Sequence, residues 1–239
     1  MGAVRITRRA LIACAAGIPF ANAQTRKLKI VVTGGHPGDP EYGCGGTVAR
    51  YTAAGHDVVL FYLNKGEKSC PDPKPEANVR VGEARKACEI LRARPKFAPQ
   101  CDAHAIVDRA HYDEFRDLLA AEKPDVVFTH WPVDNNADHR AIANLTYDAW
   151  NKLGRGFSFY YYEVSDGADT QMFTPTNYVD IAQVESVKRA ACYAHASQSP
   201  DRFYALQTEV ARFRGIESGF NLAEAFVRHA RSRGELLPA

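Results

Sequence analysis

The sequence contains no apolar run of about 20 residues, the length that a helix needs to cross a bilayer. It also contains no internal repeat and no low-complexity tract. These absences exclude a membrane-spanning body and a repeat array. The hydrophobic content of 46% over 239 residues is enough for one sizeable core. The composition therefore predicts one globular domain, which we place at residues 24–239.

The chain also lacks a strong excess of charge of one sign. Its formal net charge is +2, and Arg5, Arg8 and Arg9 lie in the first 23 residues, which hold no acid. Without that segment the charge becomes 2 − 3 = −1. Proteins that bind nucleic acid usually carry a clustered basic patch. The sequence therefore argues against a nucleic-acid partner.

Residues 1–23 have the features of an export signal. A basic segment and an apolar segment precede the small-residue pattern Ala21-Asn22-Ala23. The pair Arg8-Arg9 resembles a twin-arginine signal, so we expect a periplasmic or extracellular protein without a transmembrane segment in its mature chain. An amphipathic first helix and a lipoprotein cleavage site at Cys14 are the alternatives.

Cysteines are few in the mature chain, and their number is odd. The five are Cys44, Cys70, Cys88, Cys101 and Cys192. In an exported protein one disulfide is expected, and Cys70 with Cys101 is the best pair because both lie in proline-containing loop segments. Cys88 and Cys192 lie in helical patterns, where cysteine is typically a small buried residue.

The first half of the chain alternates short apolar runs with helical patterns. Strands are expected at 27–34, 57–63, 104–107 and 125–131, and helices at 46–55, 76–94 and 111–123. This alternation predicts an α/β fold, namely a Rossmann-like doubly wound, mostly parallel sheet with helices on both faces. We expect the strand order 3-2-1-4-5.

The second half continues without a linker. A helix is expected at 137–154, strands at 157–164 and 177–181, and helices at 183–198, 200–215 and 221–232. Three consecutive tyrosines, residues 160–162, lie in the first of these strands. Alternation would place one ring in the core and the others at the surface, unless one face of the strand stacks on a sugar.

The predicted topology makes the first and fourth strands neighbours, so the loops that leave their carboxyl ends converge. These loops read "GHPGDPE" and "WPVDNNADHR". His36, Asp39 and His139 could together supply the nitrogen and oxygen donors of a catalytic zinc site, or of a site for another divalent metal. A dinucleotide site is the weaker alternative, because the glycine spacing does not give GxGxxG.

Each donor has an alternative role in structure alone. Asp39 could cap the helix that follows it, and His36 could be an ordinary loop histidine. Asp138 is expected to cap a helix that begins at His139. We also expect Asp138 to orient that histidine from behind the metal site.

Several motifs resemble the bacterial PIG-L (LmbE-like) family of zinc-dependent N-deacetylases. They are "HPGDPE" before a glycine-rich helix start, "NKGE", "RVGE", "NADH" and "HASQ", and the likeness covers residues 28–232. The resemblance implies that His36, Asp39 and His139 bind zinc. It also implies that the substrate is a small molecule or glycan carrying an N-acetylglucosamine unit, from which acetate is released. A homo-oligomer remains open.

Two positions depart from the family pattern. The aspartate that serves the family as general base is Gly38 here, and the first histidine of its His-x-Asp-His motif is Asn136. We expect Asn136 to donate a hydrogen bond to a developing oxyanion, a role that amide side chains can fill. Asp134 is the favoured replacement base, ahead of Glu41 and Glu67.

Without the usual base, a catalytically silent protein that binds metal and glycan is the alternative function. Arg80 matches a family arginine near the substrate, although on a helix ahead of Glu83 it could form a surface ion pair. His195 and Gln198 also match the family, but their chemistry suggests no role from the sequence.

Overall fold

The computed structural model describes residues 26–67, 75–164 and 169–238. The predicted export signal lies outside the described residues. Cys101 is disulfide-bonded, while Cys70, its predicted partner, is also outside them, so that pairing stays a prediction. Cys44, Cys88 and Cys192 are free and buried. Within the described part of the chain, no helix has the length and apolar character to span a membrane.

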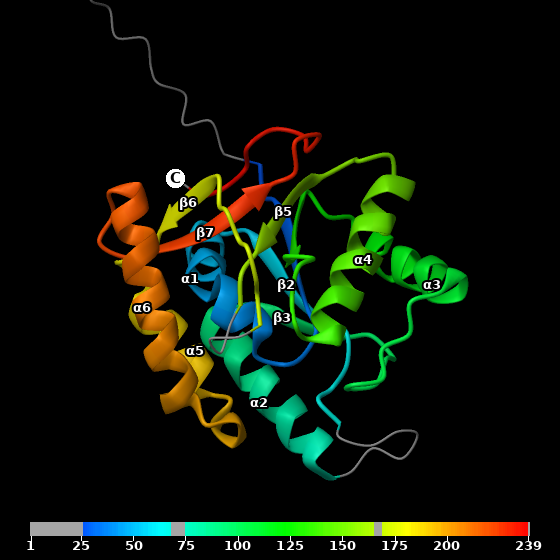
Figure 1. Ribbon diagram of the computed structural model, residues 1–239, viewed down its shortest axis with the longest axis horizontal. Helices are drawn as coiled ribbons and strands as arrows, with labels where there is room; N and C mark the ends of the chain where they lie inside the picture. The colour runs from blue at the N-terminus through cyan, green and yellow to red at the C-terminus, as the bar shows by residue number, and fades with distance from the viewer. Residues whose placement is uncertain (1–25, 68–74, 165–168, 239) are drawn as a thin grey trace, which may run out of the picture.

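The described elements alternate along the chain (Figure 1). The strands are β1 (Lys29–Gly34), β2 (Asp57–Tyr62), β3 (Arg94–Phe97), β4 (Val126–His130), β5 (Ser158–Tyr162), β6 (Asn177–Asp180) and β7 (Ala223–Arg228). The helices are α1 (Asp39–Ala53), α2 (Pro75–Leu91), α3 (Arg109–Ala120), α4 (Ala137–Lys152), α5 (Glu185–Tyr193), the 3-10 turn η1 (Ala196–Gln198) and α6 (Pro200–Ser218).

The strands form one seven-stranded sheet in the order β3-β2-β1-β4-β5-β7-β6. The first five pair in parallel, and β7 pairs antiparallel with both β5 and β6. This confirms the predicted fold class and the expected order of the first five strands. It also places the carboxyl ends of β1 and β4 side by side, because Val32 pairs with Phe128.

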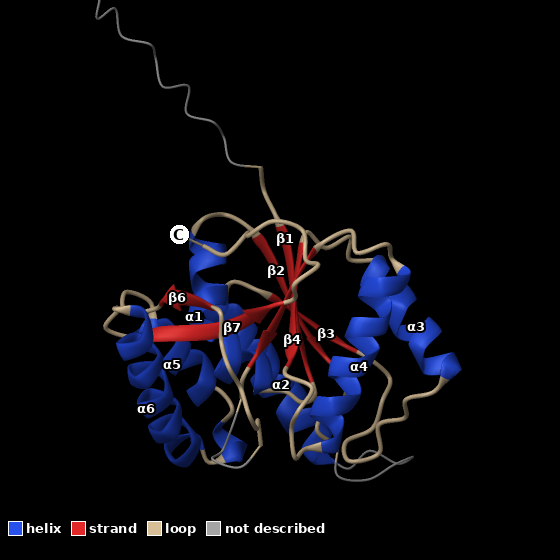
Figure 2. Cartoon of the chain, turned by 45° about the horizontal axis from the view of Figure 1, so that its top comes forward, coloured by secondary structure: helices blue, strands red, loops and turns tan. Residues whose placement is uncertain are grey.

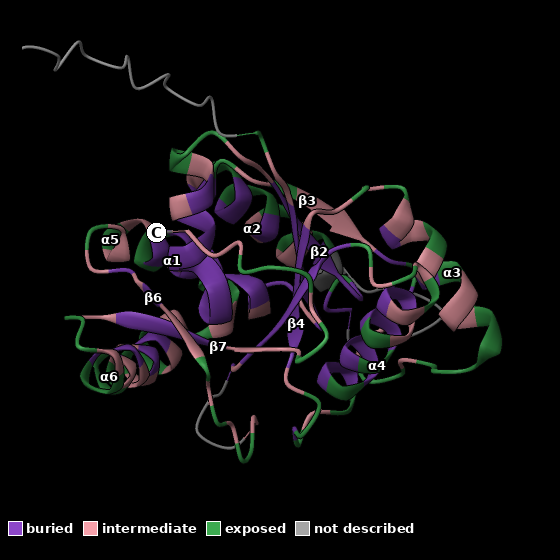
Figure 3. Ribbon diagram, turned by 90° about the horizontal axis from the view of Figure 1, so that it is seen from above, coloured by how far each residue is buried: buried purple, intermediate pink, exposed green. Residues whose placement is uncertain are grey.

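Helices cover the sheet on both faces (Figure 2). One core joins β1, β2 and β4 to α1, α2 and α5, with Val48, Cys88 and Cys192 at its centre. The other joins the same strands to α3 and α4, where Leu119 and Trp150 are fully buried. A view from above shows the buried residues concentrated in the strands and in the inner faces of the helices (Figure 3). The site loops therefore leave from a scaffold that packs on both sides.

The third strand was predicted at the wrong place. Residues 104–107 form no strand, and β3 instead follows α2 directly, across Arg92 with a φ of 53°. β3 was not predicted because it contains Pro95, and a proline normally argues against a strand. Among the described strands β3 lies at the edge of the sheet and pairs with β2 alone, so one missing N–H is tolerated there.

The predicted helix at 221–232 is also wrong, because this segment contains strand β7, Ala223–Arg228. Alanine and glutamate favour a helix locally, but pairing with β5 and β6 on both sides overrides that preference. Its buried Glu224 accepts hydrogen bonds from the backbone N–H groups of Gly46 and Thr47, and pairs with Lys188. All three tyrosines of β5 are buried, Tyr160 and Tyr162 in one core and Tyr161 in the other, so no ring of the strand is free for a sugar.

Candidate metal centre and its cavity

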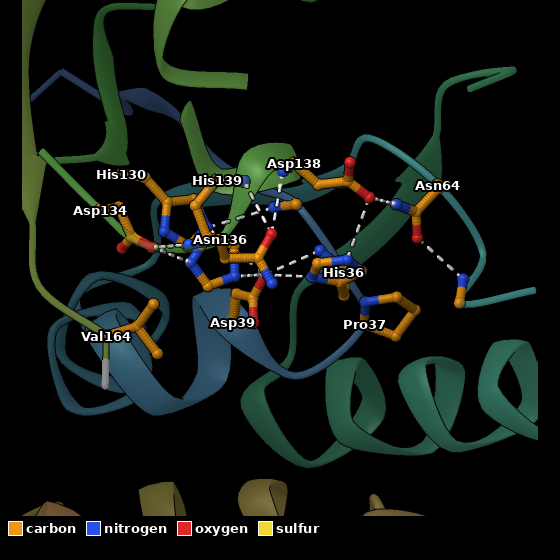
Figure 4. A network of polar contacts seen from close by, with 12 residues as sticks. His36, Pro37, Asp39, Asn64, His130, Asp134, Asn136, Asp138, His139 and Val164 are labelled. Carbon is orange, nitrogen blue, oxygen red and sulfur yellow. Dashed lines mark hydrogen bonds and ion pairs between the residues drawn. The ribbon is translucent and has the colours of Figure 1, made fainter. Parts of the chain in front are cut away.

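Three predicted donors meet at the carboxyl ends of β1 and β4. Asp39 Oδ2 lies 3.2 Å from His36 Nδ1 and 3.3 Å from His139 Nε2. One donor atom of each residue lies within 4.8 Å of the other two. Figure 4 shows the two imidazoles turned toward the carboxylate between them. The fold thus brings together residues about one hundred positions apart, as the strand order predicted.

At Gly35 the backbone next to these donors has little room for a side chain. A Cβ added at Gly35 would lie 3.0 Å from His139 Cδ2 and 3.2 Å from Asp39 Oδ2. Asp39 does not cap α1, because Gly38 is the N-cap residue and makes no side-chain cap bond. Asp39 Oδ2 instead accepts a hydrogen bond from the His36 backbone N–H at 2.7 Å, which fixes the carboxylate in the loop.

Asp134 lies behind His139. Its Oδ1 is 3.2 Å from His139 Nδ1 and accepts a hydrogen bond from the Asn136 backbone N–H, while Oδ2 accepts from Thr170 Oγ1. The side chain has no exposed surface. A carboxylate in this position orients the ring and leaves Nε2 available as a ligand. The structure therefore gives Asp134 the orienting position that the sequence had suggested for Asp138.

Asp138 orients the other histidine. Its Oδ2 lies 3.2 Å from His36 Nε2 and accepts hydrogen bonds from Asn64 Nδ2 and from the Ala103 backbone N–H. The prediction that it caps α4 and orients His139 is wrong, because α4 begins at Ala137, so that Asp138 lies inside the helix. Asn136 is the N-cap, and its Oδ1 accepts from the N–H groups of Asp138 and His139.

His130 is a site residue that the sequence analysis missed. Its ring stacks on that of His139 with centroids 4.1 Å apart and an interplanar angle of 16°. Its Nε2 accepts a hydrogen bond from the Gly35 backbone N–H, and its Nδ1 has no partner among the described residues. Because His130 ends the β-branched run of β4, nothing but its residue type marked it for the site.

The carboxylates set the charge of the histidines. Burial disfavours protonation of His36, but Asp102, Asp138 and Asp39 outweigh it and raise its pKa well above the usual value. His139 behaves in the same way, and Asp39 and Asp134 raise its pKa to about 9 against the effect of burial. The pKa of His130 instead falls to about 4, because it is buried and lies beside His139.

A cavity of about 280 Å³ opens onto the three donors. Its lining residues are His36, Pro37, Gly38, Asp39, Tyr42, Arg80, Asp102, Asn136, His139, Val164, Asp169, His195, Gln198, Phe203 and Gln207. Asn136, Arg80, His195 and Gln198 therefore face one space with the metal donors. Asp134, the favoured base, does not line it.

Arg80 reaches the cavity and does not pair with Glu83. Its Nη2 donates to the Pro37 carbonyl at 3.0 Å, and its Nη1 lies 3.7 Å from Asp102 Oδ2. Glu83 accepts instead from the backbone N–H and the hydroxyl of Ser197. Asp102, which the sequence analysis did not select, also places its Oδ1 3.1 Å from His36 Nε2. Arg80 and Asp102 therefore form one charged surface beside the three metal donors.

The two remaining acids that had been considered as bases have structural partners. Glu41 Oε1 accepts from the Tyr62 hydroxyl and lies 2.9 Å from His195 Nε2, and Glu41 is fully buried and does not line the cavity. Glu67 accepts from the Lys65 backbone N–H and is buried. Gly38, which has a φ of 113°, leaves the family's base position without a side chain.

The fold and the site together define an α/β protein with a group of two histidines and one carboxylate that opens into a cavity. The family model described as PIG-L, GlcNAc-PI de-N-acetylase, matches residues 31–150, half of the chain. The chain belongs to the PIG-L family.

Known relatives resemble it over most of its length. A diacetylchitobiose deacetylase from Thermococcus kodakarensis is 27% identical over 217 residues, 82% of this chain and 81% of the relative. The crystal structure of the conserved protein TT1542 from Thermus thermophilus superposes with a TM-score of 0.72 and 26% identity, covering 89% of this chain and 96% of that one.

A third relative is the N,N'-diacetylchitobiose deacetylase from Pyrococcus horikoshii. It also gives a TM-score of 0.72, at 21% identity over 89% of this chain and 87% of its own, and this likeness shows the fold. The family and the deacetylase from Thermococcus kodakarensis identify the chain as an enzyme of the hydrolase class.

Proposed function

We propose that the protein is a zinc-dependent amide hydrolase that removes an acyl group from the nitrogen of an N-acetylglucosamine-type sugar or glycoconjugate. The observation that carries this proposal is the group His36, Asp39 and His139, whose donor atoms lie within 4.8 Å of one another and which lines the cavity. The family and the deacetylase relative support it.

The residues present fit zinc. Two imidazole nitrogens and one carboxylate oxygen are a ligand set of catalytic zinc sites, and carboxylates hold the second nitrogen of each histidine. When bound, zinc polarises a carbonyl group and lowers the pKa of a coordinated water toward about 7. Another divalent metal with the same donor preference would serve the same purpose.

Asn136 is the residue that we assign to the developing oxyanion. Its Oδ1 accepts hydrogen bonds from two backbone N–H groups at the start of α4, which orients the amide. Asn136 lines the cavity, so its Nδ2 group is available as a donor there. A preorganised donor of this kind stabilises negative charge in a transition state. Because the amide is neutral, Asn136 cannot deliver a proton to the leaving nitrogen.

Arg80 and Asp102 are assigned to the sugar. A guanidinium and a carboxylate side by side provide donors and acceptors for neighbouring hydroxyl groups. Both are mostly buried, with 11% and 18% of their side chains exposed, so their orientation is fixed before a substrate arrives.

Among the described residues, the site lacks an evident general base. Gly38 carries no base, and both oxygens of Asp134 are engaged behind His139. Loss of a general base costs roughly 10² to 10⁴ in rate, so we expect slow turnover. The same observation favours a second candidate, a protein that binds metal and glycan without turnover.

One experiment separates these two. Purified residues 24–239 are assayed for acetate release from N-acetylglucosamine and N,N'-diacetylchitobiose, and zinc is measured on the same sample. We expect slow release that a chelator abolishes and zinc restores. Bound zinc without acetate release on either sugar would favour the binding protein, and His139→Ala serves as the control without a complete site.

We further propose that the protein works outside the cytoplasm, on the grounds of the twin-arginine pattern at residues 1–23. Fusing residues 1–30 to a reporter that is active only after export in the folded state tests this. Export that persists when Arg8 and Arg9 are both replaced by Lys would contradict the twin-arginine route.

A further inference from the structure

Two unlike groups of residues line the cavity together with the metal donors. Arg80 and Asp102 form the charged side. Tyr42 from α1, Phe203 from α6 and Val164 after β5 form the other side. The rings of Tyr42 and Phe203 meet edge to face with centroids 6.5 Å apart. One side of the cavity thus suits hydroxyl groups and the other suits hydrocarbon.

Gly38 lines the same cavity, directly before Asp39 in the chain. A Cβ added to it would lie 3.8 Å from Cδ2 of Tyr42 and 3.9 Å from Cδ2 of His195, which are ordinary contact distances. The space beside Gly38 is therefore bounded by two rings and left open by the glycine. Since the φ of 113° is one that L side chains rarely adopt, this backbone conformation suits a residue without a side chain.

A substrate of the proposed class can match both groups of residues in the following orientation. Its amide carbonyl lies at the metal donors and its sugar hydroxyls at Arg80 and Asp102. The acyl carbons then extend past Gly38 toward Tyr42 and Phe203. A methyl group alone would leave this apolar side partly unfilled, whereas each further methylene would lose contact with water there.

We propose that the preferred substrates carry a short aliphatic N-acyl group longer than acetyl, with butanoyl as the representative. This rests on the proposed amide hydrolysis. In that reaction the C–N bond of the amide breaks, water supplies hydroxyl to the acyl carbon and hydrogen to the nitrogen, and butanoic acid and the free amino sugar leave. No other reactant is required.

The test compares N-acetyl-, N-propanoyl- and N-butanoylglucosamine by kcat/KM and, with a zinc-free sample, by Kd. Burial of one methylene changes an equilibrium by about fourfold, and butanoyl has two more methylenes than acetyl, so the preference for butanoyl over acetyl should reach about 16-fold. Phe203→Ala should reduce that ratio severalfold. Phe213→Ala is the matched control, because Phe213 lies on the same helix, is 55% exposed and does not line the cavity.

Each outcome supports or overturns the proposed acyl preference. Equal or better use of the acetyl sugar by the unaltered protein would overturn the acyl preference while leaving the amide hydrolase in place. If none of the three sugars is hydrolysed, the proposed hydrolysis fails and the ratio of the Kd values tests the apolar side by itself, with equal values overturning it. If Phe203→Ala does not fold, judged by circular dichroism and zinc content, Phe203→Leu replaces it.

Discussion

Replacing Asp134 by Asn should weaken zinc binding. The substitution keeps the size of the side chain and removes its negative charge. In the structure Oδ1 lies 3.2 Å from His139 Nδ1 and Oδ2 accepts from Thr170 Oγ1, and the side chain is wholly buried. The carboxylate thus holds the ring with Nε2 toward Asp39 and makes that nitrogen a stronger donor.

Loss of such a partner typically costs 10- to 100-fold in metal affinity, or about 1.4 to 2.7 kcal/mol. The expected result for Asp134→Asn is therefore a zinc Kd that is higher by this factor, measured by competition with a chromophoric chelator. At saturating zinc the rate should fall much less. Asp113→Asn is the control, since that carboxylate is 48% exposed on α3 and pairs with Arg116.

The opposite pattern would refute this reasoning. If zinc affinity is unchanged while the rate at saturating zinc falls 10²-fold or more, then Asp134 handles a proton and does not simply orient His139. That result would restore the role that the sequence analysis favoured.

Three further predictions concern the same loops. His139→Ala should remove the bound metal, measured by elemental analysis, and a full zinc complement in this variant would contradict the ligand set. Zinc affinity should rise as the pH rises to about 9. The reason is that carboxylates raise the pKa of His139 to about 9 against the effect of burial, and only the neutral imidazole binds metal. A zinc Kd that is constant between about pH 6 and 9 would be inconsistent with coordination by His139. Gly38→Asp should lower the free energy of unfolding by about 1–2 kcal/mol, since the φ of 113° disfavours a side chain. If the site lacks a general base, Gly38→Asp should also raise the rate of hydrolysis per folded molecule by up to about 10²-fold. An unchanged rate per folded molecule would show that the missing base does not limit turnover.

The sequence predicted the core of the site because each step followed from a strong pattern. β-branched runs marked β1, β2 and β4, and the alternation with helices fixed which strands are neighbours. The convergence of His36, Asp39 and His139 then followed from the topology, even without the family resemblance. Arg80, selected from the resemblance, also reaches the cavity.

The orienting residues were harder to predict, because their roles depend on shifts of one turn or less. Since α4 begins at Ala137 with Asn136 as its cap, Asp138 turns to His36 and Asp134 turns to His139. Asp102 reaches the site from the segment after β3, a strand that the proline had hidden. Side-chain partners of this kind are fixed by tertiary packing and leave no periodic signal.

The most direct test of the central claim is a crystal structure of the zinc-loaded protein with anomalous data collected at the zinc edge. We expect one peak within about 2.0–2.2 Å of His36 Nδ1, Asp39 Oδ2 and His139 Nε2. Two other groups of donors occur in the described residues, one at His36, Asp102 and Asp138 and one at His130, Asp134 and His139. A peak in either of these, with none between His36, Asp39 and His139, would contradict the account.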